Sequence, residues 1–230
     1  MEKRYRYVIS FSNLLEFYML RPYLKSSFYF DYQSEEIQNM VAPFINLKND
    51  EQKIEQLYLF VRDGWRYNPY VIGIEEKNYV ASKIFHKKEA HCIDKAILYI
   101  AGLRALEIPA RLRLAKVSNH IATERLEEKL GTNELAPHGL VDVFHEQRWV
   151  KCSPAFNKEL CDLYNVEVLN FDGSEDSILQ EYNKDQSRFM SYIEDYGHFE
   201  DVPLARIKHI FSSNYPELYN DYLENDGLKF

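Results

Sequence analysis

A helix followed at once by an alternating strand constrains the fold of this chain more than any other feature. Apolar residues recur at helical spacing after Cys92, and this spacing predicts a helix with one apolar face: Ile93, Ala96, Ile97, Ile100, Ala101 and Leu103. Pro109 ends the helix. The sequence RLRLAKV at 111–117 alternates as a half-buried strand does. We therefore expect a helix that packs directly against a sheet.

The remaining elements are predicted on both sides of this unit. Their expected positions are a strand at 5–11, a short helix at 31–44, a helix at 50–63 capped by Asp50, a partly helical excursion at 121–135, and a hairpin of 140–144 with 149–152. Short helices and acidic loops are expected over 158–230. Helices, then an antiparallel sheet, then helices predict an α+β fold.

Length and composition bound the protein's class. With 230 residues, 46% of them apolar, and no linker or internal repeat, we expect a single domain over 1–230. The net charge of −8 disfavours a nucleic-acid partner, which needs a basic face. No apolar run reaches the roughly 20 residues of a membrane helix, so no membrane partner is expected. Three cysteines cannot all pair, which favours a reducing, cytoplasmic location. The oligomeric state stays open.

Cys92 stands where a loop turns into the apolar helix, and two interpretations compete. A thiol attacks as thiolate, and the N–H groups of a helix N-terminus lower its pKa from about 8.5. However, free cysteine is also among the most buried residue types, so Cys92 could be purely structural. A nucleophile needs a base. His138 begins the predicted hairpin and is the candidate, whereas His91 is expected to point away from the Cys92 side chain.

Three motifs carry a resemblance to a known family. HCIDKAILYIAGLRALEIPARL resembles the cysteine helix of the transglutaminase-like superfamily, and HGLVDVFHEQRWV resembles its histidine strand. CSPAFN resembles the block that follows, which also ends in Pro-Ala-Phe-Asn in bacterial members. The motifs occur in the family's order and cover residues 50–160, about half of the chain.

The resemblance implies a papain-like core with helices packed on an antiparallel sheet. Cys92 would be the nucleophile at a helix N-terminus and His138 the base. The backbone N–H of Cys92 would form the oxyanion hole with a second donor, for which Trp65, Tyr67 and Asn68 are candidates. The substrate would be an amide in a peptide or protein, hydrolysed by a cysteine peptidase or amidase rather than cross-linked, and no cofactor is implied.

Three positions depart from the family's pattern, among them Ala90, where the family has a glycine two residues before the cysteine. Ser153 stands where the family has the Asp that orients the histidine, and a hydroxyl carries no charge to stabilise imidazolium. Ser153 could act as a weaker third residue. Asn157, Asp142 or Asp172 could replace it. Alternatively the site is catalytically silent and the domain binds peptides or proteins. Glu107 replaces a glycine before Ile-Pro, so that turn is expected to differ.

Other groups of residues in the sequence do not have the pattern of a metal site. The three cysteines at 92, 152 and 161 with His138 lack zinc spacing, and FDGSEDS at 171–177 lacks the ligand pattern of an EF-hand, so we expect no metal. Cys152 and Cys161 are expected in the core. The acidic aromatic stretch at 192–203 is expected to be a packed loop; in a less favoured interpretation His198 and Asp201 lie near the site.

Overall fold

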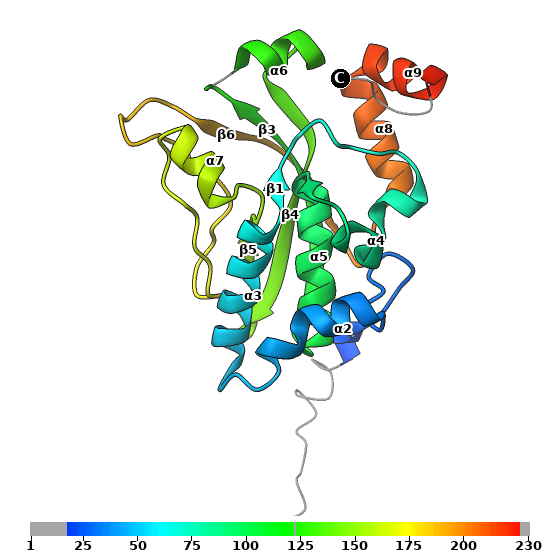
Figure 1. Ribbon diagram of the computed structural model, residues 1–230, viewed down its shortest axis with the longest axis vertical. Coiled ribbons are helices and arrows are strands. Elements are labelled where there is room, and N and C mark those ends of the chain that lie inside the picture. Colours follow the sequence, from blue (N-terminus) through cyan, green and yellow to red (C-terminus); the bar gives the residue numbers. More distant parts are fainter. Residues whose placement is uncertain (1–17, 122, 226–230) are drawn as a thin grey trace, which may run out of the picture.

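The computed structural model describes residues 18–121 and 123–225, so the strand predicted at 5–11 lies outside the described residues. Helices pack against a four-stranded antiparallel sheet, and two C-terminal helices lie at one end of it (Figure 1). The helices are η1 Arg21–Leu24, α2 Glu35–Val41, η2 Ala42–Phe44, α3 Asp50–Gly64, η3 Glu76–Tyr79, α4 Ala81–Phe85, α5 Cys92–Ala105, α6 Thr123–Leu130, α7 Lys158–Leu163, α8 Leu204–Asn214 and α9 Pro216–Asn225. The strands are β1 Arg66–Tyr67, β2 Glu89–Ala90, β3 Ala110–Asn119, β4 Glu134–His145, β5 Arg148–Cys152 and β6 Met190–Phe199.

Helix α3 confirms the helix predicted at 50–63, with a different cap. Asn49, not Asp50, is the N-cap, and its side chain accepts a hydrogen bond from the Gln52 N–H at 3.0 Å. Asp50 is instead the first helical residue, where a carboxylate also stabilises the helix dipole. The predicted apolar stripe is buried against the rest of the core.

Helix α5 is the centre of the molecule. Every residue from Cys92 to Arg104 is buried, because helices α2, α3 and α4 pack around it and strands β3 and β4 cover its remaining side. A helix that is apolar nearly all round is typical of such a central position. The predicted single apolar face therefore underestimates how much of this helix is enclosed.

The turn after α5 corrects one expectation. Glu107 adopts the left-handed backbone conformation, with φ of 62°, that a glycine usually provides at this position. The Ile108 N–H donates to the Leu103 carbonyl at 2.9 Å, which ties off the end of the helix. The turn keeps its glycine-like geometry, and a glutamate bears the conformational strain.

The sheet has the order β5–β4–β3–β6, and all its pairs are antiparallel. Strands β4 and β5 form the predicted hairpin, with His145 opposite Arg148. The acidic stretch expected to be a packed loop is largely strand β6, which pairs with β3. Its pattern gave no strand signal because it lies at the edge of the sheet, where half of its residues are exposed and only one is buried.

Helices α8 and α9 complete the C-terminal part of the described chain. Ile207 and Ile210 of α8 belong to the main hydrophobic cluster, whereas Phe211 and Tyr215 form a smaller one with Ile74. The Tyr215 hydroxyl donates to the Glu134 carbonyl and accepts the Ala136 N–H, both at 2.7 Å. These contacts fasten the C-terminal helices to the start of β4.

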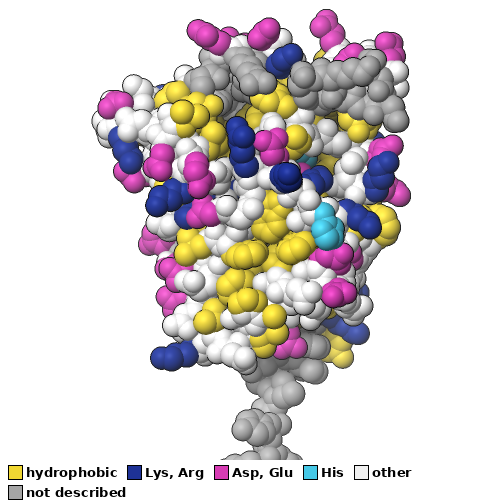
Figure 2. All heavy atoms as spheres, in the orientation of Figure 1, with side chains coloured by type: hydrophobic (Ala, Val, Ile, Leu, Met, Phe, Trp, Pro, Cys, Tyr) yellow, Lys and Arg dark blue, Asp and Glu magenta, His cyan; other side chains and the backbone are white. Residues whose placement is uncertain are grey.

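Charged side chains of both signs are mixed on the face of the molecule that Figure 2 shows. In the face shown by Figure 2, Lys and Arg side chains are interspersed with Asp and Glu, and hydrophobic side chains gather towards the lower middle. None of the helices in the described ranges is both long and apolar enough to cross a membrane.

Candidate active site

Cys92 is the first residue of α5, and the preceding segment sets its position. Strand β2 pairs in parallel with β1, with Tyr67 opposite Ala90, so the chain reaches Cys92 beside Tyr67. His91 is the N-cap of α5, and its Nδ1 accepts a hydrogen bond from the Asp94 N–H at 3.0 Å. The Asp94 carboxylate accepts the His91 backbone N–H at 3.4 Å, which completes a capping box. The thiol therefore stands at a rigid helix start.

Burial decides the protonation state of Cys92. Only 7% of the residue is exposed, and burial raises the pKa of its thiol to about 11. Hydrogen bonds from the backbone N–H groups of Gly139 and Ile93 lower this pKa, but they offset the effect of burial only in part. The expected lowering of the pKa by the helix N-terminus is thus outweighed by desolvation. In this conformation Cys92 is a neutral thiol at pH 7.

His138 lies near the start of β4, directly after the cis bond between Ala136 and Pro137. It is 2% exposed, and burial lowers the pKa of its imidazole to about 4, with the neighbouring His91 as a second cause. Its Nδ1 is buried and has no hydrogen-bond partner among the described residues. His138 is therefore neutral at pH 7 and able to accept a proton.

The backbones that carry these two side chains pack tightly together. A Cβ placed on Gly139, the neighbour of His138, would lie 2.8 Å from the Cα of Ile93, the neighbour of Cys92. Only glycine allows strand β4 to approach the start of α5 this closely. The sulfur lies against the Gly139 N–H, but none of the hydrogen bonds between described residues joins it to the His138 imidazole.

A pocket opens beside the thiol. Its empty volume is about 470 Å³, part of which is open solvent. Cys92, His91 and Tyr67 line one side, and Phe211, Tyr215 and Leu218 of the C-terminal helices line another. Both the Cys92 thiol and the N-cap histidine therefore face a space that a small group can enter.

Comparison with known proteins fits this arrangement of a cysteine helix and a histidine strand. A model of the transglutaminase-like superfamily matches residues 39–154, which include Cys92 and His138. The chain belongs to the transglutaminase-like superfamily. Its helices packed on an antiparallel sheet are the α+β, papain-like core that the motifs implied.

Among solved structures, the chain is similar to a protein from Cytophaga hutchinsonii named "Putative Cysteine Protease", with a TM-score of 0.46 and 16% sequence identity. The similarity covers 79% of this chain and 54% of that protein, so the chain spans about half of its length. No curated protein matches the chain.

Ser153 takes the place of the family's orienting Asp. Its backbone is well held, since its N–H donates to Ser177 and its carbonyl accepts the Tyr58 hydroxyl at 2.8 Å. Continuing the β4–β5 register beyond Val141 and Cys152 places Ser153 opposite Leu140, two residues from His138. No hydrogen bond between described residues connects the Ser153 hydroxyl with His138, whose Nδ1 is unpartnered.

The alternative third residues are engaged elsewhere. Asp142 is fully buried between Arg111 at 2.9 Å and Arg113 at 2.7 Å. Asn157 accepts the Tyr67 N–H at 2.9 Å and donates to Glu159. Two further candidates also have other partners, Asp172 in a turn with Ser174 and Asp201 with Ser27. His198 pairs with Arg113 in the β3–β6 register.

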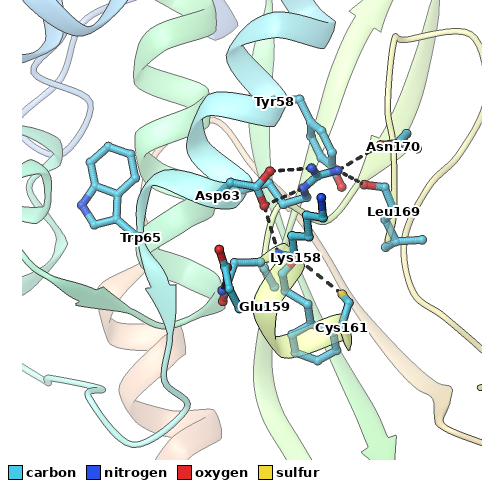
Figure 3. A network of polar contacts seen from close by, with 12 residues as sticks. Tyr58, Asp63, Trp65, Lys158, Glu159, Cys161, Leu169 and Asn170 are labelled. Carbon is cyan, nitrogen blue, oxygen red and sulfur yellow. Dashed lines mark hydrogen bonds and ion pairs between the residues drawn. The ribbon is translucent and has the colours of Figure 1, made fainter. Parts of the chain in front are cut away.

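Of the three candidate oxyanion donors, Tyr67 alone lines the pocket that contains Cys92. The Trp65 indole N–H donates to the Phe85 carbonyl at 3.3 Å. Figure 3 shows Trp65 apart from the ion-paired end of α3, where Asp63 accepts the Lys158 N–H at 3.0 Å. The Asn68 amide donates to Glu89 at 2.7 Å, and its oxygen accepts the Tyr70 N–H. These bonds commit Trp65 and Asn68 to the scaffold.

His91 is the functional candidate that sequence reasoning missed. It was expected to point away from Cys92, but the capping bond to Asp94 folds its ring back beside the first turn of α5. The ring is 3% exposed and lines the same pocket as the thiol. A polar residue three positions before an acidic one at a helix start is the signal that could have located it.

Lys95 of helix α5 is a buried lysine that contacts three backbone segments. The Lys95 ammonium donates to the carbonyl oxygens of Arg62 at 2.6 Å, Trp65 at 3.0 Å and Ala155 at 2.7 Å. Burial lowers the pKa of Lys95 to about 7. This one side chain therefore joins helix α5 to the end of α3 and to the block after β5.

Within the described ranges, no group of three or more His, Cys, Asp or Glu side chains is arranged to hold a metal ion. Cys152 and Cys161 are free and fully buried in the core, as their positions in the sequence predicted.

Proposed function

We propose that this protein is a cysteine enzyme that takes an acyl group from an amide in a peptide or protein and passes it to water. The observation that carries the proposal is the close packing of the Cys92 helix start on the strand of His138, where a Cβ added to Gly139 would lie only 2.8 Å from the Cα of Ile93. That packing holds a thiol, which lines an open pocket, and a neutral imidazole on adjoining rigid elements.

The two neutral groups set the chemistry of the first step. Because the pKa of Cys92 is about 11 and that of His138 about 4, no thiolate–imidazolium pair exists at pH 7 in this conformation. Attack must then be coupled to proton transfer: the sulfur bonds to the carbonyl carbon while its proton passes to the imidazole. This step needs the sulfur and a ring nitrogen of His138 within hydrogen-bond reach, an approach that none of the hydrogen bonds between described residues makes in this conformation.

The later steps use the same groups. The oxyanion of the tetrahedral intermediate would accept the Cys92 N–H, which has no acceptor within its own helix, and the Tyr67 hydroxyl. The C–N bond breaks as His138 returns its proton to the amine. Water then attacks the thioester and gives one proton to His138, which passes it to the sulfur as the C–S bond breaks, so that the carboxylic acid and the free thiol are formed. We favour water as acceptor because none of the residues around the pocket marks an amine site.

One observation favours a second function. The unpartnered Nδ1 of His138 shows no group that would stabilise an imidazolium, and Ser153 does not reach it. A catalytically silent domain that binds peptides or proteins at the same pocket would have this arrangement.

A pair of histidine variants separates the two functions. A peptidyl chloromethyl ketone modifies an active-site cysteine when the sulfur displaces chloride, and mass spectrometry locates the modified residue. We expect modification of Cys92 at pH 7.5, with Cys152 and Cys161 protected, and a loss of about 100-fold in His138→Gln, within the range that one general base contributes. His145→Gln, on the same strand but away from the pocket, is the matched control.

The opposite result is equally informative. If folded His138→Gln reacts as fast as the unaltered protein, or if Cys92 is not modified at all, the enzyme proposal fails and the binding function stands. Cooperative unfolding of each variant confirms that it is folded.

A further inference from the structure

One wall of the Cys92 pocket is formed by the C-terminal helices. This wall lies outside the segment that the transglutaminase-like family model matches. That segment ends at residue 154, whereas Phe211, Tyr215 and Leu218 belong to α8, α9 and the residue between them. The C-terminal helices are therefore an addition to the core that reaches the reactive centre.

This wall is fixed in place by hydrogen bonds from tyrosine hydroxyls. Tyr215 bridges the backbone of Glu134 and Ala136 on the strand that carries His138, at 2.7 Å each. Tyr222 of α9 accepts the Ile74 N–H, at 3.4 Å, from the loop on the other side of the pocket. Both sides of the pocket are thus tied to α8 and α9, and a bound group would meet a preformed surface.

The lining of the Cys92 pocket is apolar apart from Cys92 and His91. The described residues that line the pocket include no Asp, Glu, Lys or Arg. Apart from Cys92 and His91, they are aliphatic, aromatic or proline side chains, such as Ile72, Leu135 and Leu218. A charged group placed here would lose its hydration with no partner, whereas an apolar one gains from burial.

Charged groups gather instead in the neighbouring groove. Arg66, Glu89 and Glu124 line this groove, which meets the Cys92 pocket at Tyr67, Pro69 and Leu135. A substrate chain lying across this junction would have an apolar space beside the thiol and a polar one further along.

From this we infer that the C-terminal helices select the acyl group: the Cys92 pocket is a subsite for an uncharged aliphatic or aromatic side chain next to the scissile amide. Phe211 and Leu218 determine this specificity through contact with that side chain. The inference rests on the proposed function and names the class of its substrate.

Four chloromethyl ketones test it, built on N-acetylated leucine, phenylalanine, lysine and aspartate. The rate at which each modifies Cys92 is divided by its rate with a small free thiol. We expect the leucyl and phenylalanyl probes to react at least about tenfold faster than the charged ones, since even one methylene in an apolar pocket is worth about tenfold or more.

A charge placed in the pocket should reverse the preference. Leu218→Asp should lower the leucyl rate and raise the lysyl-to-leucyl ratio at least about tenfold. Leu218 is half-buried, so the variant is expected to fold, and Leu218→Asn is a milder second variant. Leu223→Asp introduces the same charge on the same helix at a residue that is 59% exposed and should leave the ratio unchanged.

Each outcome bears on the two proposals differently. Equal rates for the four probes, or a ratio unaffected by both Leu218 variants, would overturn the subsite while the enzyme proposal stands. If no probe modifies Cys92, both are overturned. A ratio that shifts as much in Leu223→Asp as in Leu218→Asp would mean that general electrostatics, not the pocket, sets the preference.

Discussion

Replacing Gly139 with alanine tests whether the packing of β4 on α5 builds the site. The new methyl group would lie 2.8 Å from the Cα and 2.9 Å from the Cγ1 of Ile93. Carbon atoms pack best about 3.5–4.0 Å apart, so helix and strand must separate by about 1 Å. The Cα and the backbone N of Ile93, the latter at 3.0 Å, belong to helix α5 and cannot move without it, and overpacking of this kind costs about 1–3 kcal/mol. We expect Gly139→Ala to lower the free energy of unfolding by that amount.

The same displacement should separate the thiol from its base. Denaturant unfolding measures the loss of stability, and the rate of Cys92 modification by the leucyl probe measures the separation of the thiol from its base. A shift of 1 Å in a reacting group can cost about 100-fold in rate. Gly64→Ala is the control, because a Cβ there meets no other heavy atom within 4 Å. An unfolding free energy within about 0.5 kcal/mol of the unaltered protein, together with an unchanged modification rate, would refute the reasoning.

Three further predictions concern stability. The pKa of His138 is about 4 in the folded protein and 6.5 ordinarily, so below pH 6.5 the unfolded chain binds the proton more readily than the folded protein does. The free energy of unfolding should therefore fall by about 3 kcal/mol between pH 6.5 and 4. In denaturant titrations, His138→Gln should lose that part of the pH dependence. Glu107→Gly should raise the thermal midpoint, with a gain of about 1 kcal/mol, since glycine relieves the left-handed strain at φ of 62°; an unchanged or lower midpoint argues against strain. Asp142→Asn should cost about 3–5 kcal/mol by leaving Arg111 without the Asp142 carboxylate and Arg113 with that of Asp195 alone, and a loss below 1 kcal/mol in urea unfolding would contradict this.

Local pattern was sufficient for the elements that carry the site. The spacing of apolar residues located α3 and α5, and alternation located β3 and the β4–β5 hairpin. These segments follow the periodicity of their own structure because one or both faces are buried. Strand β6 lies at an exposed edge of the sheet, so its sequence does not show this periodicity.

Sequence by itself therefore determined the fold class, the family, and the order in which Cys92 and His138 occur. Tertiary structure decided what these groups are: a thiol with a pKa near 11, an imidazole with an unpartnered Nδ1, and a pocket shared with His91 and closed by helices more than 100 residues away in the chain. It also decided that Asp142 serves two arginines rather than His138. The physical reason is that burial, and therefore desolvation, depends on which distant segments pack over a side chain, and local residue types do not encode that.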